Sequence, residues 1–105
     1  MSDLEETLAL HIKAAGLPEP VREYMAIKGR RYRLDFAWPA VKLGVEVQGG
    51  IWHKGGHSTG TGITRDCEKA NAHTLAGWRI IYLTAADVNS GAGVEVIKQA
   101  LEARE

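Results

Sequence analysis

Two short segments that alternate apolar and polar residues constrain the fold more than any other part of this chain. They are "RLDFAW" at residues 33–38 and "KLGVEVQ" at residues 42–48. An alternation of period two is typical of strands that bury one face. Because only a few residues around Pro39 and Ala40 separate the two segments, we predict that they form an antiparallel hairpin.

The register of this hairpin follows from a turn centred between Ala40 and Val41. In that register every apolar pair falls on one face, as a buried strand face requires. The pairs are Leu34 with Val47, Phe36 with Val45, and Trp38 with Leu43. On the opposite face Asp35 lies directly across from Glu46, and Gln48 follows Glu46 on the same side. The hairpin therefore builds a site with two carboxylates.

Two facing carboxylates repel each other, and each loses solvation where water is excluded. A shared proton, a basic partner or a divalent cation would relieve this repulsion. Mg²⁺ or Mn²⁺ suits such a site, because these ions commonly take one or two protein carboxylates and complete their shell with water and phosphate oxygens. Gln48 can add an amide oxygen and Val47 a backbone carbonyl oxygen. The alternative interpretation is a solvent-facing pair of acids on an exposed sheet face.

Residues 3–15 are expected to form an amphipathic helix, because Leu4, Leu8 and Ile12 recur at helical spacing. On a helical wheel Glu5 lies about 60° from the centre of this apolar stripe, whereas Glu6 points nearly the opposite way, toward water. Glu5 is therefore at the margin of the packed face, from where its carboxylate can reach the sheet.

The rest of the chain predicts further elements around the hairpin. We expect a short strand at 21–27, a glycine-rich loop at 49–63, a helix at 64–77, a buried strand at 78–84 and a final helix at 93–104. This order indicates the α/β class, with a mixed β-sheet flanked by helices in a single domain that spans residues 1–105.

The expected helix 64–77 has two contrasting sides. Its apolar stripe comprises Cys67, Ala70, Thr74 and Leu75. Its other side gathers Arg65, Asp66, Lys69 and His73. The stripe predicts the packed side of the helix, with Cys67 as a small buried residue. His73 is expected to be structural or exposed.

An acid in the first helix is followed by "LDF", "VEVQG", a histidine, a charged helix and "GWRIIYLT", in this order between about residues 2 and 84. Together these motifs resemble the PD-(D/E)XK nuclease superfamily, with its restriction-endonuclease-like fold, and in particular the small very-short-patch-repair-like endonucleases. The resemblance implies a divalent-metal-dependent DNA endonuclease. It makes Asp35 and Glu46 the metal-binding acids and Glu5 the acid that supports them.

The chain departs from the superfamily pattern at the lysine of the motif, where Gln48 stands. A glutamine cannot supply the positive charge with which that lysine stabilises developing negative charge. Gln48 then positions the attacking water as a neutral group, or the cation comes from Lys69 or Lys54, or the site has lost its activity. His53 matches the family's histidine and is expected to transfer a proton or to contact phosphate.

Basic residues suggest how such a site would hold DNA. Four of them, Lys28, Arg30, Arg31 and Arg33, come just before the acid of the strand that carries Asp35, while Lys54 lies in the glycine-rich loop and Arg65 follows it. Cationic clusters of this kind contact phosphates, although they also occur as solvated strand edges. The glycines of the loop would permit close approach of a nucleic-acid backbone.

Net charge and cysteine content indicate how the protein could attract nucleic acid and in which compartment it is located. The net charge is zero, so any attraction to nucleic acid depends on a local patch. The single cysteine excludes an internal disulfide and fits a reducing cytoplasm. No apolar run is long enough to cross a membrane, and a cytoplasmic location is expected.

The leading hypothesis is a metal-dependent endonuclease that acts on nicked, mismatched or branched DNA, as in a phage or mobile-element repertoire, and a homodimer would be compatible with it. The alternatives are an inactive nucleic-acid-binding domain that retains the fold, and a hydrolase of other phosphoesters.

Overall fold

The computed structural model of the chain describes residues 3–48 and 60–103. Its centre is a four-stranded sheet of strand order β1-β2-β3-β4. The strands are β1 (Val21–Tyr24), β2 (Leu34–Trp38), β3 (Leu43–Val47) and β4 (Arg79–Leu83). β1, β2 and β3 pair antiparallel, whereas β3 and β4 pair parallel. The mixed α/β sheet expected from the sequence is therefore confirmed.

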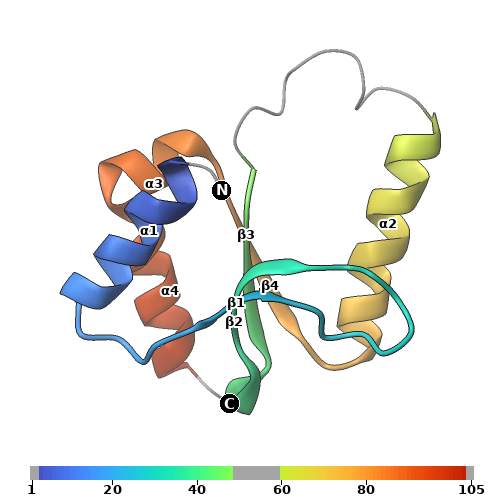
Figure 1. Cartoon of the computed structure of the whole chain (residues 1–105), viewed down its shortest axis with the longest axis horizontal. Coiled ribbons are helices and arrows are strands. Elements are labelled where there is room, and N and C mark those ends of the chain that lie inside the picture. The colour runs from blue at the N-terminus through green and yellow to red at the C-terminus, as the bar shows by residue number, and fades with distance from the viewer. Residues whose placement is uncertain (1–2, 49–59, 104–105) are drawn as a thin grey trace.

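The helices are α1 (Asp3–Ala14), α2 (Gly60–Leu75), α3 (Ala85–Ser90) and α4 (Ala92–Glu102). Figure 1 shows α1, α3 and α4 packed together on one face of the sheet, while α2 stands on the other face. None of the helices in the described part of the chain is long and apolar enough to cross a bilayer.

The central hairpin has the expected register. Phe36 pairs with Val45 and Trp38 with Leu43 across β2 and β3. A short 3₁₀ turn, Pro39–Val41, joins the strands and ends in a left-handed Lys42 at φ 49°. The amide of Lys42 donates to the Pro39 carbonyl at 3.1 Å, which closes the turn.

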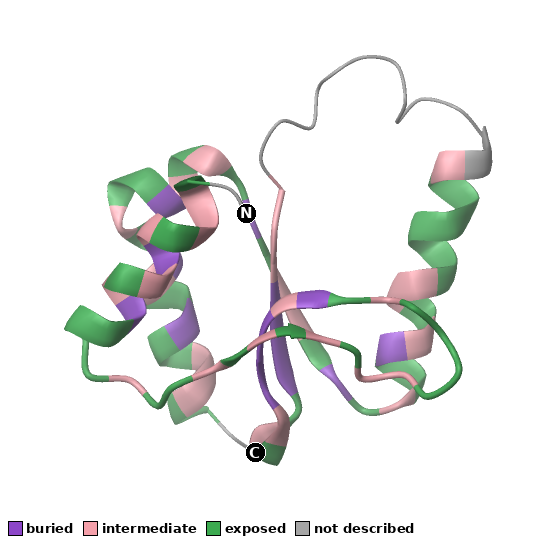
Figure 2. Cartoon of the chain, in the orientation of Figure 1, coloured by how far each residue is buried: buried purple, intermediate pink, exposed green. Residues whose placement is uncertain are grey.

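The main core lies between the sheet and the group α1, α3 and α4. Buried apolar side chains from all of these elements meet there: Leu8, Ile12, Phe36, Trp38, Leu43, Val45, Leu83, Val88 and Ile97. Figure 2 shows these buried residues along β2 and β3 and on the helix sides that face them. The apolar stripe predicted for the first helix is thus the stripe that packs.

Leu34 corrects one expectation, because it does not share a face with Phe36. Its side chain belongs to a second buried cluster with Ala37 and Trp78, whereas Val47 packs against the main core. The space is provided by Gly44: a Cβ atom there would lie 2.6 Å from Leu34 Cδ1. Leu34 fills the volume that a side chain at Gly44 would otherwise occupy.

The packed side of α2 also differs from the prediction. Cys67 is exposed and Leu75 is 86% exposed, so the stripe interpreted as the packed side faces solvent for the most part. His73, from the polar side, is 1% exposed, and Lys69 is half-buried. The reason is the position of α2, which lies over the polar end of the sheet and the second cluster rather than over the main core. The helix also begins at Gly60, four residues before the expected start at residue 64.

Three other elements also differ from the sequence-based expectation. β1 ends at Tyr24, and β4 is an edge strand with two exposed side chains, Arg79 and Tyr82, rather than a fully buried strand. The expected C-terminal helix is preceded by a separate helix, α3. Thr84 caps the N-terminus of α3, because its side chain accepts from the Asp87 amide while the Asp87 side chain accepts from the Thr84 amide. Gly91, at φ 90°, separates α3 from α4.

Candidate active site

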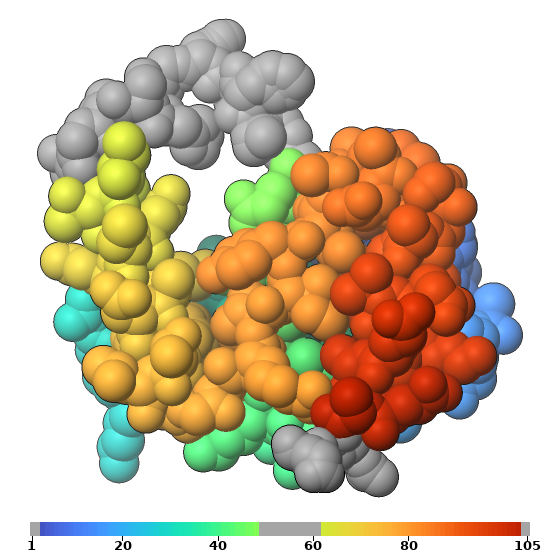
Figure 3. Space-filling model, turned by 180° about the vertical axis from the view of Figure 1, so that it is seen from behind, coloured from blue at the N-terminus to red at the C-terminus, as the bar shows by residue number. Residues whose placement is uncertain are grey.

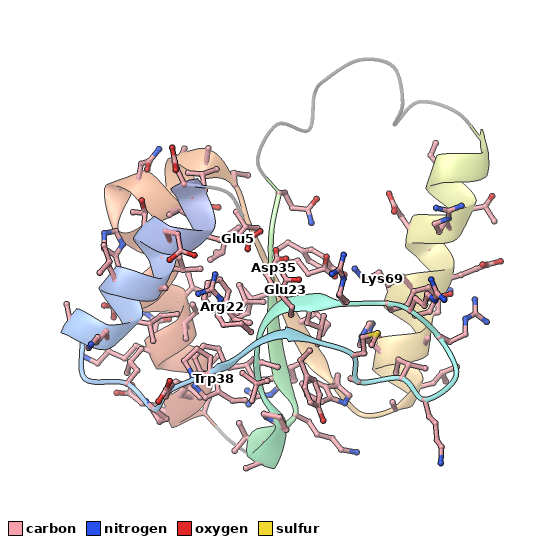
Figure 4. The ribbon with its side chains drawn as sticks, viewed as in Figure 1. Glu5, Arg22, Glu23, Asp35, Trp38 and Lys69 are labelled. Atoms are coloured by element: carbon pink, nitrogen blue, oxygen red, sulfur yellow. The ribbon has the colours of Figure 1, made fainter. Side chains whose placement is uncertain are left out.

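A polar cleft of about 490 Å³ opens between α1, the sheet and α2. Figure 4 shows Glu5 directed from α1 and Lys69 directed from α2 toward Asp35 on the sheet. The cleft is lined by Glu5, Glu23, Arg31, Tyr32, Arg33, Asp35, Glu46, Val47, Arg65, Asp66 and Lys69. The structure therefore brings together three of the acids and the helix lysine that the sequence analysis singled out.

Asp35 lies where the backbone pairing of β2 and β3 ends. Beyond the Phe36–Val45 pair, the Val47 amide donates to Asp35 Oδ2 at 2.8 Å. The N–H and C=O of one strand residue point toward the same neighbouring strand. The Val47 carbonyl is therefore directed toward the side on which Asp35 lies, and Val47 itself lines the cleft.

Glu46 is held by a lysine from the facing helix. Lys69 Nζ lies 2.9 Å from each carboxylate oxygen of Glu46, and it also donates to the Arg33 carbonyl at 3.0 Å. The side chains of Glu46 and Lys69 are 15% and 24% exposed, so water screens this pair less than a surface ion pair. One turn along α2, His73 Nδ1 donates to the Lys69 carbonyl at 2.9 Å, a hydrogen bond within the same helix.

Glu5 occupies the margin predicted for it, with 17% of its side chain exposed, whereas the Glu6 side chain is 51% exposed. Burial raises the pKa of Glu5 above its ordinary value, and the charges of Asp35 and Glu23 raise it further. Arg22, whose guanidinium lies 3.7 Å from Glu5 Oε1, offsets part of that rise in pKa. The rise in pKa therefore reflects first the burial of Glu5 and then its repulsion by the neighbouring acids.

Gln48 lies beside the cleft rather than within its lining. It borders an adjoining cavity of about 410 Å³ together with Glu46, Asp66, Lys69 and Tyr82. The backbone amide of Gln48 donates to the Leu83 carbonyl at 2.6 Å, so β4 fixes the backbone of Gln48. Gln48 and Lys69 therefore approach Glu46 from different elements, the sheet and helix α2.

The basic residues divide into two groups. Arg31, Arg33 and Arg65 line the cleft. Arg33 pairs with Glu23 at 2.9 Å, and Arg30 lies 4.0 Å from Glu68. Arg30 and Lys28 do not line the cleft. His53 and Lys54 lie outside the described residues.

Four residues of the two cavities were not assigned to a site from the sequence: Glu23, Tyr32 and Asp66 in the cleft, and Tyr82 in the adjoining cavity. Asp66 precedes Lys69 by three residues, and this spacing places both on one side of a helix. That signal was available from the sequence. The sequence offered no such signal for Glu23. Its backbone is left-handed, at φ 49°, although it lies within strand β1, and the sequence pattern does not indicate this conformation.

The donor set of the cleft fits a hard divalent cation. Asp35 and Glu46 supply carboxylate oxygens, and the Val47 carbonyl is a neutral oxygen close to Asp35. Burial raises the pKa of Glu5 most, and the repulsion by Asp35 and Glu23 that raises it further is one that a cation would relieve. Within the part of the chain that the structure describes, no group of three or more His, Cys, Asp or Glu side chains is arranged to hold a metal ion.

No protein-family model matches the chain. No curated protein matches it either. Among solved structures, the chain is similar to the "Homing Endonuclease I-Bth0305I Catalytic Domain", with a TM-score of 0.68 and 15% sequence identity over 95% of this chain and 93% of that one. The chain has a nuclease-like α/β fold. At this level of identity the likeness concerns the fold alone.

Proposed function

We propose that the chain is a divalent-metal-dependent DNA endonuclease of the PD-(D/E)XK type, in which Lys69 replaces the lysine that the motif lacks. The observation that carries the proposal is the meeting of Asp35, Glu46 and Lys69 in one cleft, with Lys69 Nζ 2.9 Å from the Glu46 carboxylate. The nuclease-like fold supports the same reaction class.

The charges of the cleft explain why a metal would be required. Its lining holds five acids and four basic side chains, so an acidic excess of one faces an incoming phosphate. Mg²⁺ or Mn²⁺ bound by Asp35, Glu46 and the Val47 carbonyl would supply Lewis-acid polarisation of the phosphate and a more acidic water. Glu5 adds negative charge near Asp35 and so favours a cation at that place.

Lys69 is better placed than Gln48 to provide the positive charge of the motif. It is an ammonium group, it contacts Glu46 directly, and it is held by helix α2 rather than by the strand. In the proposed reaction Lys69 orients the attacking water and stabilises the negative charge that develops on the phosphate. His53, matched to the family histidine, would serve as a proton donor or acceptor.

DNA would enter over Arg31, Arg33 and Arg65, which line the cleft. Lys28, Arg30 and Lys54 would extend this contact to neighbouring phosphates.

The proposal includes a cytoplasmic location, which suits the free and exposed Cys67. It includes nicked, mismatched or branched DNA as substrate and a homodimer with one site for each strand. The exposed side chains of Ile63 and Leu75 on α2 support contact between copies.

Cleavage of labelled linear, nicked, mismatched and branched DNA with Mg²⁺ or Mn²⁺ tests the proposal. The wild type should cut at least one of these substrates, and EDTA should abolish cleavage. The Asp35→Asn and Glu46→Gln variants should be inactive, and Glu95→Gln, on the exposed side of α4, is the matched control. Mg²⁺ should also raise the melting temperature of the wild type but not that of Asp35→Asn. Cleavage by Asp35→Asn at the wild-type rate would overturn the site.

The ion pair between Lys69 and Glu46 favours a second candidate function. A lysine that neutralises Glu46 by itself reduces the need for a metal, as expected in a nucleic-acid-binding domain that has lost catalysis. Such a domain would bind DNA with an affinity that falls as salt rises, and it would cut none of the substrates with any metal. Binding that is unchanged by Mg²⁺, together with no cleavage, would decide for this candidate.

A further inference from the structure

A second cavity adjoins the cleft on the side of the edge strand β4. It has a volume of about 410 Å³ and shares Glu46, Asp66 and Lys69 with the cleft, while Gln48 and Tyr82 belong to it alone. Figure 3 shows the surface hollowed between α2 and the ends of β3 and β4. A cavity of this volume lies within the range of small-ligand sites. Any group that fills it would lie directly beside Glu46 and Lys69.

Tyr82 is an unusual residue for this position. It pairs with Glu46 in the parallel register of β3 and β4, so both side chains point to the same face of the sheet. That face is the polar one, yet Tyr82 presents an aromatic ring that is 52% exposed. Its strand neighbour Leu83 is 2% exposed and belongs to the main core. The ring of Tyr82 thus contributes little to the core and remains available to a ligand.

The two residues particular to this cavity are neutral. Gln48 carries an amide that both donates and accepts hydrogen bonds, and Tyr82 carries a ring and a phenol. Burial raises the pKa of Tyr82, and the charges of Glu46 and Asp66 raise it further, so the phenol stays protonated at neutral pH. A ring next to an amide suits a nucleobase and its sugar better than a phosphate, because it offers stacking and hydrogen bonds rather than charge.

We propose that Gln48 and Tyr82 form a nucleotide subsite, which holds the nucleotide next to the scissile phosphate. The inference rests on the proposed endonuclease function and adds the contact that positions the strand. It also gives the glutamine a role: Lys69 provides the charge of the motif, and Gln48 is available to contact the substrate. The ring of Tyr82 would stack on the base or sugar, and the amide of Gln48 would bind its polar edge.

Steady-state cleavage by Tyr82 and Gln48 variants tests the subsite. Tyr82→Ala should raise KM by about 5- to 140-fold, the loss that corresponds to one stacked base. Tyr82→Phe keeps the ring and should stay within about 5-fold of the wild type. Gln48→Ala should raise KM by about 2- to 12-fold. Tyr24→Phe is the matched control, because Tyr24 packs against Trp78 in the second cluster, away from both cavities.

A substrate change provides a readout that a structural role of Tyr82 would not move. After the cleaved bond has been mapped, an abasic nucleotide is placed on either side of it in turn. At one of the two positions the wild type should lose activity, and Tyr82→Ala should show no further loss there. Equal sensitivity of the wild type and Tyr82→Ala at both positions would overturn the subsite.

Other outcomes separate the subsite from the proposed function. If Asp35→Asn is inactive while Tyr82→Ala keeps the wild-type KM, the subsite is wrong and the endonuclease function stands. If Tyr82→Ala changes the oligomeric mass of the protein in solution but not its cleavage of DNA, Tyr82 contacts another copy of the chain and the subsite is wrong. If the wild type cuts no DNA with any metal, the proposed function fails and the subsite fails with it.

Discussion

The two faces of the sheet are built from the same strands but serve different ends. The face toward α1, α3 and α4 is closed by a continuous apolar core. The face toward α2 has a small apolar cluster around Leu34, Ala37 and Trp78, and beyond it the polar cleft. Neighbouring residues of one strand, Asp35 and Phe36, therefore lie in opposite environments.

This difference shows how a chain of 105 residues accommodates a charged site. One face supplies most of the apolar burial, and the other can hold acids that would be costly inside a core. α2 makes this arrangement work because it packs through His73 at one end and presents Lys69 toward Glu46. Its solvent side can then be apolar without harm to the site.

The sharpest test of this contrast uses the neighbours Asp35 and Phe36. Asp35→Asn should reduce cleavage by about a thousandfold or more, the several kcal/mol expected of a lost metal ligand. It should change stability by less than about 1 kcal/mol, because an amide oxygen can still accept from the Val47 amide. Phe36→Ala should instead lower the free energy of unfolding by about 3–5 kcal/mol.

Urea denaturation followed by circular dichroism measures the stabilities, and gel-based cleavage measures the activities. A large loss of stability in Asp35→Asn would contradict the division between the two faces. So would an unchanged unfolding midpoint in Phe36→Ala, since Phe36 is fully buried in the main core.

The next test concerns the lysine supplied by α2. Lys69→Met should lower kcat by about 100- to 1,000-fold, as expected when a group that stabilises the transition state is removed. Lys98→Met, on the exposed side of α4, should leave kcat unchanged. Single-turnover cleavage with the protein in excess measures the chemical step. If Lys69→Met weakens DNA binding and leaves the single-turnover rate intact, Lys69 is a phosphate contact and the motif's charge comes from elsewhere.

The smallest expected effect concerns Glu5, which is partly buried and repelled by other acids at the margin of the cleft. The pKa of Glu5 in the folded state is raised above its ordinary value of 4.5. Its ionised form is therefore disfavoured in the folded state, and stability is lost as pH rises from below 4.5 through the raised pKa. Glu5→Gln removes this loss, so it should be more stable than the wild type at neutral pH, by less than about 1 kcal/mol.

Thermal melts between pH 4 and pH 7 measure the Glu5 effect, with the range chosen to span about the ordinary pKa of a carboxyl group. The difference between Glu5→Gln and the wild type should shrink toward the acidic end. Asp3→Asn is the control, because Asp3 is an exposed acid in the first turn of the same helix. A Glu5→Gln variant that is less stable than the wild type at neutral pH would mean that contacts of the Glu5 carboxylate outweigh its repulsion.

Much of the fold and of the acidic site could be predicted from local patterns. The alternation in β2 and β3 predicted the pairs Phe36–Val45 and Trp38–Leu43, and Asp35 and Glu46 both line the cleft. The helical wheel placed Glu5 correctly at the margin of α1. These predictions were correct because each depends on neighbours within one hairpin or one helix.

Predictions that depended on distant partners were less successful. The apolar stripe of α2 suggested its packed side, but Leu75 and Cys67 face solvent. Periodicity cannot distinguish a helix that covers an apolar core from one that covers a polar cleft. Leu34 was assigned to the wrong face because the free space above Gly44 is a property of the packed sheet.

The sequence by itself determined the hairpin, with the pairs Phe36–Val45 and Trp38–Leu43, and placed the acids Asp35 and Glu46 on its two strands, because side-chain direction in a strand alternates with every residue. Only the tertiary structure decided which cation meets those acids. Lys69 is 23 residues from Glu46 along the chain, and the ion pair forms because α2 packs across the sheet. The same packing set Gln48 and Tyr82 side by side, since parallel pairing of β3 with β4 unites segments that are distant in sequence.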